Sequence, residues 1–78
     1  MNHKPLLDEC EALGLKVVRV PDTGAEAYNA TTSGVCVYWR KSSTSDGLLG
    51  LPRVVVNGVD THARSVKEVR YLVRRSAL

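Results

Sequence analysis

The three residue types of a hydrolase triad lie close together near the end of the chain, at Asp60, His62 and Ser65. A triad needs side chains that converge on one point, and neighbours on a strand end and a helix start do not converge in this way. Ser65 also has a simpler role, because Glu68 three positions later completes the pattern of a helix capping box. The rest of the sequence offers no paired carboxylates and no nucleophile beside a base. We therefore expect no catalytic residue and no enzyme.

The cysteines and the serine-rich segment do not form a metal or nucleotide site either. Cys10 and Cys36 have no His or Cys neighbours at zinc-ligand spacing, so we expect free thiols. A Cys10 to Cys36 disulfide is the alternative if both side chains point into the core. The segment from Ser42 to Gly50 lacks the Gly and Lys spacing of a phosphate-binding loop. The sequence therefore predicts no metal, no nucleotide and no other cofactor.

A band of basic side chains in the last segment is the clearest indication of function. From Val66 to about Ala77, apolar residues recur at helical spacing on one side, and basic residues gather on the opposite side. Such a band matches a phosphate backbone, and an aromatic ring among the cations can stack on a base. The alternative is a solvated helix face. The residues predicted to bind nucleic acid, DNA or RNA, are Arg64, Lys67, Arg70, Tyr71, Arg74 and Arg75, joined by Arg40 and Lys41.

Charge is distributed unevenly along the chain. Residues 1–32 hold three basic and five acidic side chains, a net charge of −2, and residues 33–78 hold eight basic and three acidic ones, a net charge of +5. This asymmetry favours an anionic partner or an acidic protein surface.

The segment that follows the central strands suggests a different kind of partner. Ser42 to Gly50 is rich in turn formers and has no periodicity, and a loop of this length is typically functional or mobile. Leu48, Leu49 and Leu51 either fold back onto the sheet or form an apolar patch that marks a partner site. The alternative function is therefore a small phage-type interaction module that modulates a host protein. It would use the 42–52 loop, Tyr38 or a sheet edge for strand addition.

Local patterns predict one α+β domain, residues 1–78, with an antiparallel sheet of three to five strands and two helices on one face. The spacing of Val35, Val37 and Trp39 places them on the buried face of a strand, with Trp39 as a core anchor, while Tyr38 and Arg40 face outward. The predicted elements are a helix from Pro5 to Gly14, strands over Leu15–Val20, Ala27–Thr31, Val35–Lys41, Arg53–Val56 and Val59–His62, and a helix over Val66–Ala77.

Size and hydropathy set the remaining expectations. No stretch approaches the roughly 20 apolar residues of a membrane span, so we expect a cytoplasmic protein with no membrane contact. A chain of 78 residues buries only about 60 to 65% of its unfolded surface, which makes a homodimer one way to gain stability. His3 lies close to the terminus and is expected to be disordered.

The stretch LLDECEALGLKVVRV, followed by TGAEAYNATTSGVCVYWRKSS, resembles the small HicA toxins of toxin–antitoxin pairs. The resemblance covers about half of the chain and rests on element order, with Gly14, Val18 and Gly24 as matching positions. It implies a double-stranded-RNA-binding type of fold, helix-strand-strand-strand-helix. HicA-type ribonucleases place a catalytic His just after the Gly that follows the first strand, whereas here Gly24 is followed by Ala25. The resemblance therefore implies nucleic-acid binding without RNA cleavage.

The end of the chain departs from double-stranded-RNA-binding modules in another way. Their last helix opens with a basic Lys-Lys-x-Ala-Lys motif, but this one begins Ser65-Val66-Lys67-Glu68. A second resemblance is to the three-stranded DNA-reading sheets of phage integrase arm domains, carried by Tyr38 to Lys41 and Ser65 to Val69. Small size, an Arg-rich composition and a fold without evident chemistry also suit a phage or mobile-element protein.

Overall fold

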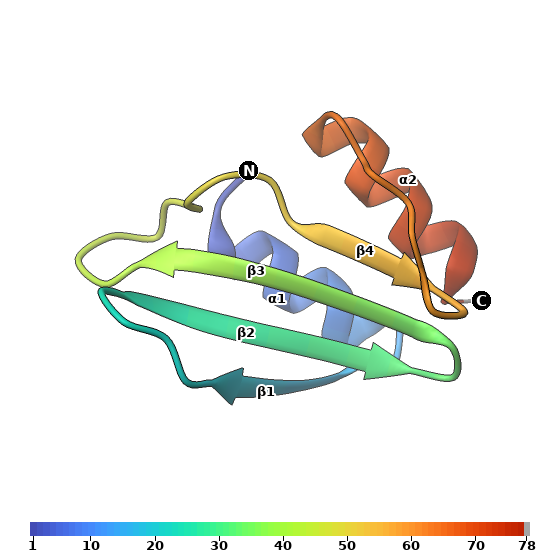
Figure 1. The fold of residues 1–78 in the computed structure, drawn as a ribbon, viewed down its shortest axis with the longest axis horizontal. Helices are drawn as coiled ribbons and strands as arrows, with labels where there is room; N and C mark the ends of the chain where they lie inside the picture. The colour runs from blue at the N-terminus through green and yellow to red at the C-terminus, as the bar shows by residue number, and fades with distance from the viewer. Residues whose placement is uncertain (78) are drawn as a thin grey trace.

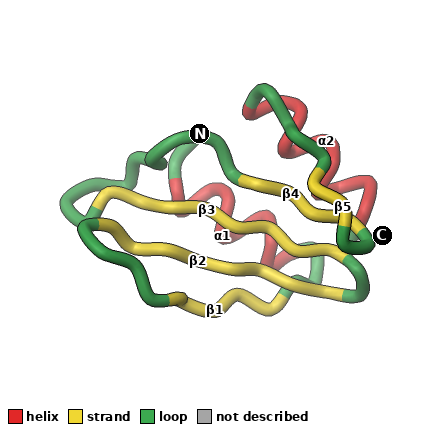
Figure 2. Tube along the Cα trace, viewed as in Figure 1, coloured by secondary structure: helices red, strands yellow, loops and turns green. Residues whose placement is uncertain are grey.

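The computed structural model describes residues 1–77 and shows an α+β fold, which confirms the predicted fold class (Figure 1). Five strands form one antiparallel sheet in chain order, and both helices lie on the same face of that sheet (Figures 1 and 2). The elements are α1 (His3–Ala12), β1 (Lys16–Val20), β2 (Ala25–Thr32), β3 (Val35–Ser42), β4 (Arg53–Val56), β5 (Val59–Asp60) and α2 (Val66–Ser76).

Two tight turns fix the register of the sheet. Asn57 and Gly58 both have positive φ angles, 51° and 81°, as a type I′ turn between β4 and β5 requires. Gly34 turns β2 into β3, and its carbonyl accepts a 2.7 Å hydrogen bond from the Asn57 backbone N–H. A Cβ atom at Gly34 would collide with the Asn57 side chain. The two turns therefore lie side by side, and the positive φ of 75° at Gly34 favours glycine at this contact.

The core lies between the sheet and the two helices. Val37 and Trp39 of β3 are at most 1% exposed, so the prediction that they share a buried face with Val35 is confirmed. The neighbouring strands and the helices complete this core with Leu6, Cys10, Leu15, Ala30, Val54, Val69 and Val73.

The thiols lie on opposite sides of the sheet. Cys10 packs in the core, where burial raises the pKa of its thiol to about 11. Cys36 pairs with Thr31 and Val55 on the face that carries no helix, and its Sγ lies 2.8 Å from the side-chain oxygen of Asn29. Both cysteines are free, as expected, and the alternative of a disulfide between them is wrong.

The start of α1 differs from the prediction, because a distant loop holds it. The carbonyl of Asp46 accepts a 2.8 Å hydrogen bond from the His3 N–H, and the Asp46 carboxylate accepts from the Lys4 N–H at 3.2 and 3.4 Å. His3 is 8% exposed, so the expectation that it is disordered is wrong. The loop itself folds back onto β3 through bonds such as Leu49 N–H to the Arg40 carbonyl. The loop therefore has a structural role as the N-terminal cap of α1.

The start of α2 follows the predicted capping pattern in part. The Ser65 hydroxyl accepts a 3.1 Å hydrogen bond from the Glu68 N–H. The Glu68 carboxylate, however, accepts from the backbone N–H of Arg64 at 3.3 Å, one residue before the expected donor. The first bond satisfies a backbone donor in the first turn of α2 that has no partner within the helix, and the second holds the residue before the N-cap.

Candidate nucleic-acid interface

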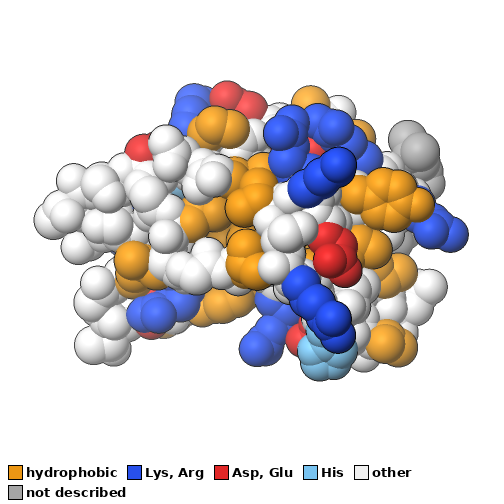
Figure 3. Space-filling view, turned by 90° about the horizontal axis from the view of Figure 1, so that it is seen from above, with side chains coloured by type: hydrophobic (Ala, Val, Ile, Leu, Met, Phe, Trp, Pro, Cys, Tyr) orange, Lys and Arg blue, Asp and Glu red, His pale blue; other side chains and the backbone are white. Residues whose placement is uncertain are grey.

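Helix α2 buries one side and turns the other to solvent. Val69 and Val73 are at most 1% exposed and pack in the core, on the side of α2 that contacts β3 and β4. On the opposite side Lys67, Tyr71 and Arg75 follow one another at intervals of four residues, and we call these three residues the outer ridge. Seen from above, Lys and Arg side chains gather over this part of the molecule (Figure 3). The basic helix face predicted from the sequence is thus exposed.

The outer ridge consists of two cationic side chains, Lys67 and Arg75, with the Tyr71 ring between them. Tyr71 is 58% exposed, and the Arg75 guanidinium donates a 3.3 Å hydrogen bond to its hydroxyl. Among residues 1–77, neither Lys67 nor Arg75 forms an ion pair, and the same holds for Arg64 just before the helix. These three cations therefore keep their full charge on the surface.

The flank of α2 that faces α1 is different, because its arginines have an acidic partner. Arg70 and Arg74 direct their Nε atoms to the two oxygens of Glu9, at 3.3 and 2.7 Å. The Glu9 side chain is only 16% exposed, whereas the two arginine side chains are 46 and 56% exposed. One carboxylate thus faces two guanidinium groups, which leaves a partly neutralised flank beside the outer ridge.

The exposed side chains of α2 line a shallow, open hollow of about 810 Å³. Its walls are mostly apolar, because the Tyr71 ring and the aliphatic stems of the basic residues form them. The charged ends of the same residues surround this apolar surface. The residues lining the hollow are Val66, Lys67, Arg70, Tyr71, Arg74 and Arg75.

The structure does not bring Arg40 and Lys41 to this surface. They lie near the end of β3, far from α2 (Figure 1), and alternation along the strand sends them to opposite faces of the sheet. Arg40 contacts Asp22 at 2.7 Å, and this contact lowers the pKa of that carboxyl. Lys41 is 15% exposed, and its Nζ donates to Glu26 at 3.0 Å and to the carbonyls of Ser42 and Ser45. Lys41 therefore serves the fold rather than the basic helix surface.

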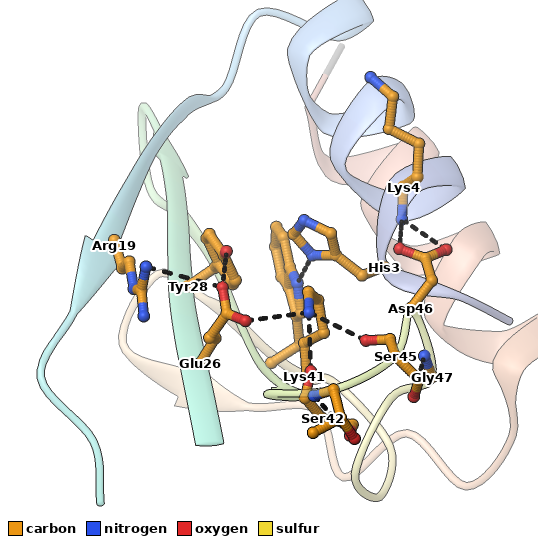
Figure 4. A network of polar contacts seen from close by, with 12 residues as sticks. His3, Lys4, Arg19, Glu26, Tyr28, Lys41, Ser42, Ser45, Asp46 and Gly47 are labelled. Carbon is orange, nitrogen blue, oxygen red and sulfur yellow. Dashed lines mark hydrogen bonds and ion pairs between the residues drawn. The ribbon is translucent and has the colours of Figure 1, made fainter. Parts of the chain in front are cut away.

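A polar network on the helix-covered face of the sheet is not predicted by the sequence patterns (Figure 4). Glu26 accepts hydrogen bonds from Lys41 and from the Tyr28 hydroxyl at 3.0 Å each, and the bond from Lys41 contributes most to lowering the pKa of Glu26. Beside it, the Trp39 indole N–H donates a 2.9 Å bond to Nδ1 of His3. The hairpin register, which sets Glu26 opposite Lys41 and Tyr28 opposite Trp39, is the signal that could have revealed the network.

The residues of the alternative function are spread over two surfaces. Leu48 packs against the core, whereas Leu49 and Leu51 are 45 and 46% exposed. Tyr38 lies on the helix-free face of the sheet, between Asn29 and Arg53 in the strand register. The loop leucines and Tyr38 therefore do not form one patch.

The triad-like residues do not converge either. Asp60 and Nδ1 of His62 lie 3.9 Å apart, and Ser65 is engaged as the cap of α2. Within residues 1–77, no three His, Cys, Asp or Glu side chains are placed to hold a metal ion. No helix in that part of the chain is long and apolar enough to span a membrane.

The resemblances noted in the sequence stay at the level of element order. The sheet has two more strands than the helix-strand-strand-strand-helix order of the HicA-type fold, because β4 and β5 lie between β3 and α2. Comparison of the chain with protein-family models, with curated proteins and with solved structures finds no match. What is established is therefore an α-β5-α arrangement with an exposed basic helix.

Proposed function

We propose that this chain is a non-enzymatic nucleic-acid-binding module that contacts phosphates with the solvent face of α2. The observation that carries the proposal is the set of exposed cations Arg64, Lys67 and Arg75, which form no ion pair within residues 1–77. Lys67 and Arg75 point outward because the opposite side of α2 is buried. A cation without an internal partner gives up no existing contact when it meets a phosphate. Release of the counterions around the nucleic acid then supplies the binding free energy.

Arg70 and Arg74 support the same surface in spite of their contact with Glu9. The hydrogen bonds to Glu9 use the Nε–H of each guanidinium, and an arginine has further N–H donors in the same plane. Two guanidinium groups facing one carboxylate still sum to one positive charge. The positive potential therefore extends across the whole solvent face of α2.

The test is the salt dependence of binding to a labelled oligonucleotide, measured by fluorescence anisotropy. We expect affinity to fall steeply with salt, with a slope of log K against log salt of about −2 to −3.5 for three to five phosphate contacts on a single strand. Changing Lys67→Ala or Arg75→Ala should make the slope on a single strand shallower by about 0.7 each. These changes should weaken binding to all sequences alike, because phosphate contacts carry no sequence information.

The matched control is Lys16→Ala on β1, which removes an exposed cation at a distance from α2. It should leave the slope unchanged. Absence of binding to both single-stranded and duplex oligonucleotides at low salt would refute the proposal. An equal effect of Lys16→Ala would show that the attraction comes from net charge rather than from α2.

A second candidate function is protein binding through the exposed leucines of the loop. Leu49 and Leu51 leave almost half of each side chain in solvent, beside an N-terminal cap that holds the loop in place. If this is the functional surface, Leu49→Ser with Leu51→Ser should abolish recovery of a stoichiometric protein from nuclease-treated lysate. Val59→Ser is the control, since Val59 is 68% exposed on β5. Recovery that survives the leucine changes would rule out this function.

A cytoplasmic location accompanies the proposal. Cys10 and Cys36 are both free thiols, and unpaired cysteines are typical of reducing compartments.

A further inference from the structure

We infer that the surface of α2 takes up single-stranded rather than duplex nucleic acid, with one unpaired base stacked on Tyr71. This inference rests on the proposed function and names the form of nucleic acid that the site accepts. It depends on the state of the Tyr71 ring, on the walls of the hollow and on the positions of the two cations beside it.

The Tyr71 side chain is exposed, and no other aromatic ring within residues 1–77 covers it. Arg75 touches it through the hydroxyl, which lies at the edge of the ring, at 3.3 Å. The aromatic contacts found in residues 1–77 join His3, Tyr28 and Trp39 inside the protein, and none involves Tyr71. An exposed aromatic side chain gains free energy when another flat apolar surface covers it. A base of a single strand is such a surface.

The hollow around the ring suits a nucleotide better than a phosphate alone. Its walls are mostly apolar, and its charged groups lie at the ends of long side chains. A bare phosphate would leave the apolar walls in water. A base on the ring with its phosphates at the cations would use both parts of the surface, as single-strand binders do.

The spacing along the helix fits a strand that runs past the ring. Lys67 and Arg75 each lie four residues from Tyr71, about 6 Å along the helix axis on either side of it. Each cation can therefore meet a phosphate that flanks the stacked base. Arg70 and Arg74, held by Glu9, line the same hollow on the flank that faces α1.

A duplex would form fewer favourable contacts with these residues than a single strand. Its bases are stacked inside the helix, so the Tyr71 ring could not reach a base face without flipping a nucleotide out, which costs a few kcal/mol. Readout in the major groove uses hydrogen bonds to base edges. The Tyr71 hydroxyl accepts a bond from Arg75 and keeps only its single O–H donor for such contacts, so the apolar face of the ring would stay unused there.

The experiment compares three labelled probes by fluorescence anisotropy with the full chain: a single strand of mixed sequence, the corresponding duplex, and an abasic strand of equal length. We expect the single strand to bind about 10-fold more tightly than the abasic strand, within the range of one base–aromatic stack. Tyr71→Ala should remove this difference and leave binding to the abasic strand and the duplex unchanged. Tyr71→Phe keeps the ring and should keep the difference.

The outcomes separate the two proposals. If none of the three probes binds at low salt, the proposed function itself fails. If all three bind and Tyr71→Ala changes nothing, α2 is a phosphate-binding surface and the stacking inference is overturned. A duplex that binds as tightly as the single strand would also overturn it. Circular dichroism of each variant checks that a loss of binding is not caused by unfolding. We expect the variants to fold, because Tyr71 is exposed and lies outside the core.

Discussion

His3 occupies an unusual position for a residue so near the start of the described chain. Its Nδ1 accepts the indole N–H of Trp39 at 2.9 Å, which requires that this nitrogen carries no proton. Burial is the largest influence and lowers the pKa of His3. Among the charged groups around it, Asp46 and Glu26 raise that pKa, and Lys41 and Lys4 lower it. The fold is therefore built around the neutral imidazole.

This arrangement predicts a loss of stability in mild acid. The unfolded imidazole, with a pKa of about 6.5, takes up a proton more readily than the folded one, so the unfolded state binds more protons as pH falls. The His3 contribution is thus present above about pH 6.5 and is lost as pH falls through the lower folded pKa. Urea unfolding followed by Trp39 fluorescence should show a midpoint that decreases from about pH 7 to pH 5.

Two glutamine variants assign this effect to its residue. His3→Gln retains a hydrogen-bond acceptor for Trp39 but cannot titrate, so its midpoint should vary much less over this pH range. His62→Gln removes a histidine whose side chain is 83% exposed, and it should behave like the original chain. A His3→Gln variant with an undiminished pH dependence would show that other groups are responsible.

At the level of elements, the sequence predicts those features of the fold that depend on interactions between residues close in the chain. The Asn57-Gly58 turn, the Ser65 cap and the alternation around Trp39 each depend on residues close in the chain, and each was confirmed. The predicted end of the last strand at His62 is wrong, because β5 covers only Val59–Asp60. The strand stops at Asp60 because its carboxylate accepts the His62 N–H at 2.8 Å, and His62 has a positive φ of 53°.

Features that join distant residues escaped the sequence patterns. Asp46 caps a helix that begins 43 positions earlier, and only the folded chain shows that a polar loop residue has this role. The basic face of α2 was predicted as a whole from helical periodicity. The pairing of Arg70 and Arg74 with Glu9 spans more than 60 positions, so periodicity could not separate these two arginines from the unpaired ones.

At the scale of the whole molecule, the acidic first part and the basic second part of the chain bind each other. Glu9 contacts Arg70 and Arg74, and two further ion pairs join Asp22 to Arg40 and Glu26 to Lys41. Part of the uneven charge along the sequence is therefore balanced by ion pairs within the protein. The asymmetry does not by itself indicate an anionic partner. What remains for a partner is the smaller group of cations on and before α2 that have no ion pair within residues 1–77, namely Arg64, Lys67 and Arg75.

Glu9 stabilises the folded protein but is expected to weaken the proposed binding to nucleic acid. Glu9→Gln removes a partner of two half-exposed arginines, and we expect a loss of about 0.5 to 1 kcal/mol in the free energy of unfolding, measured in urea. The same change frees both guanidinium groups, so affinity for a single strand at low salt should increase and its salt slope should steepen. Glu11→Gln alters net charge equally on the exposed side of α1 and should change both quantities less. If Glu9→Gln weakens binding, the carboxylate holds the arginines in their binding geometry instead of competing with phosphate for them.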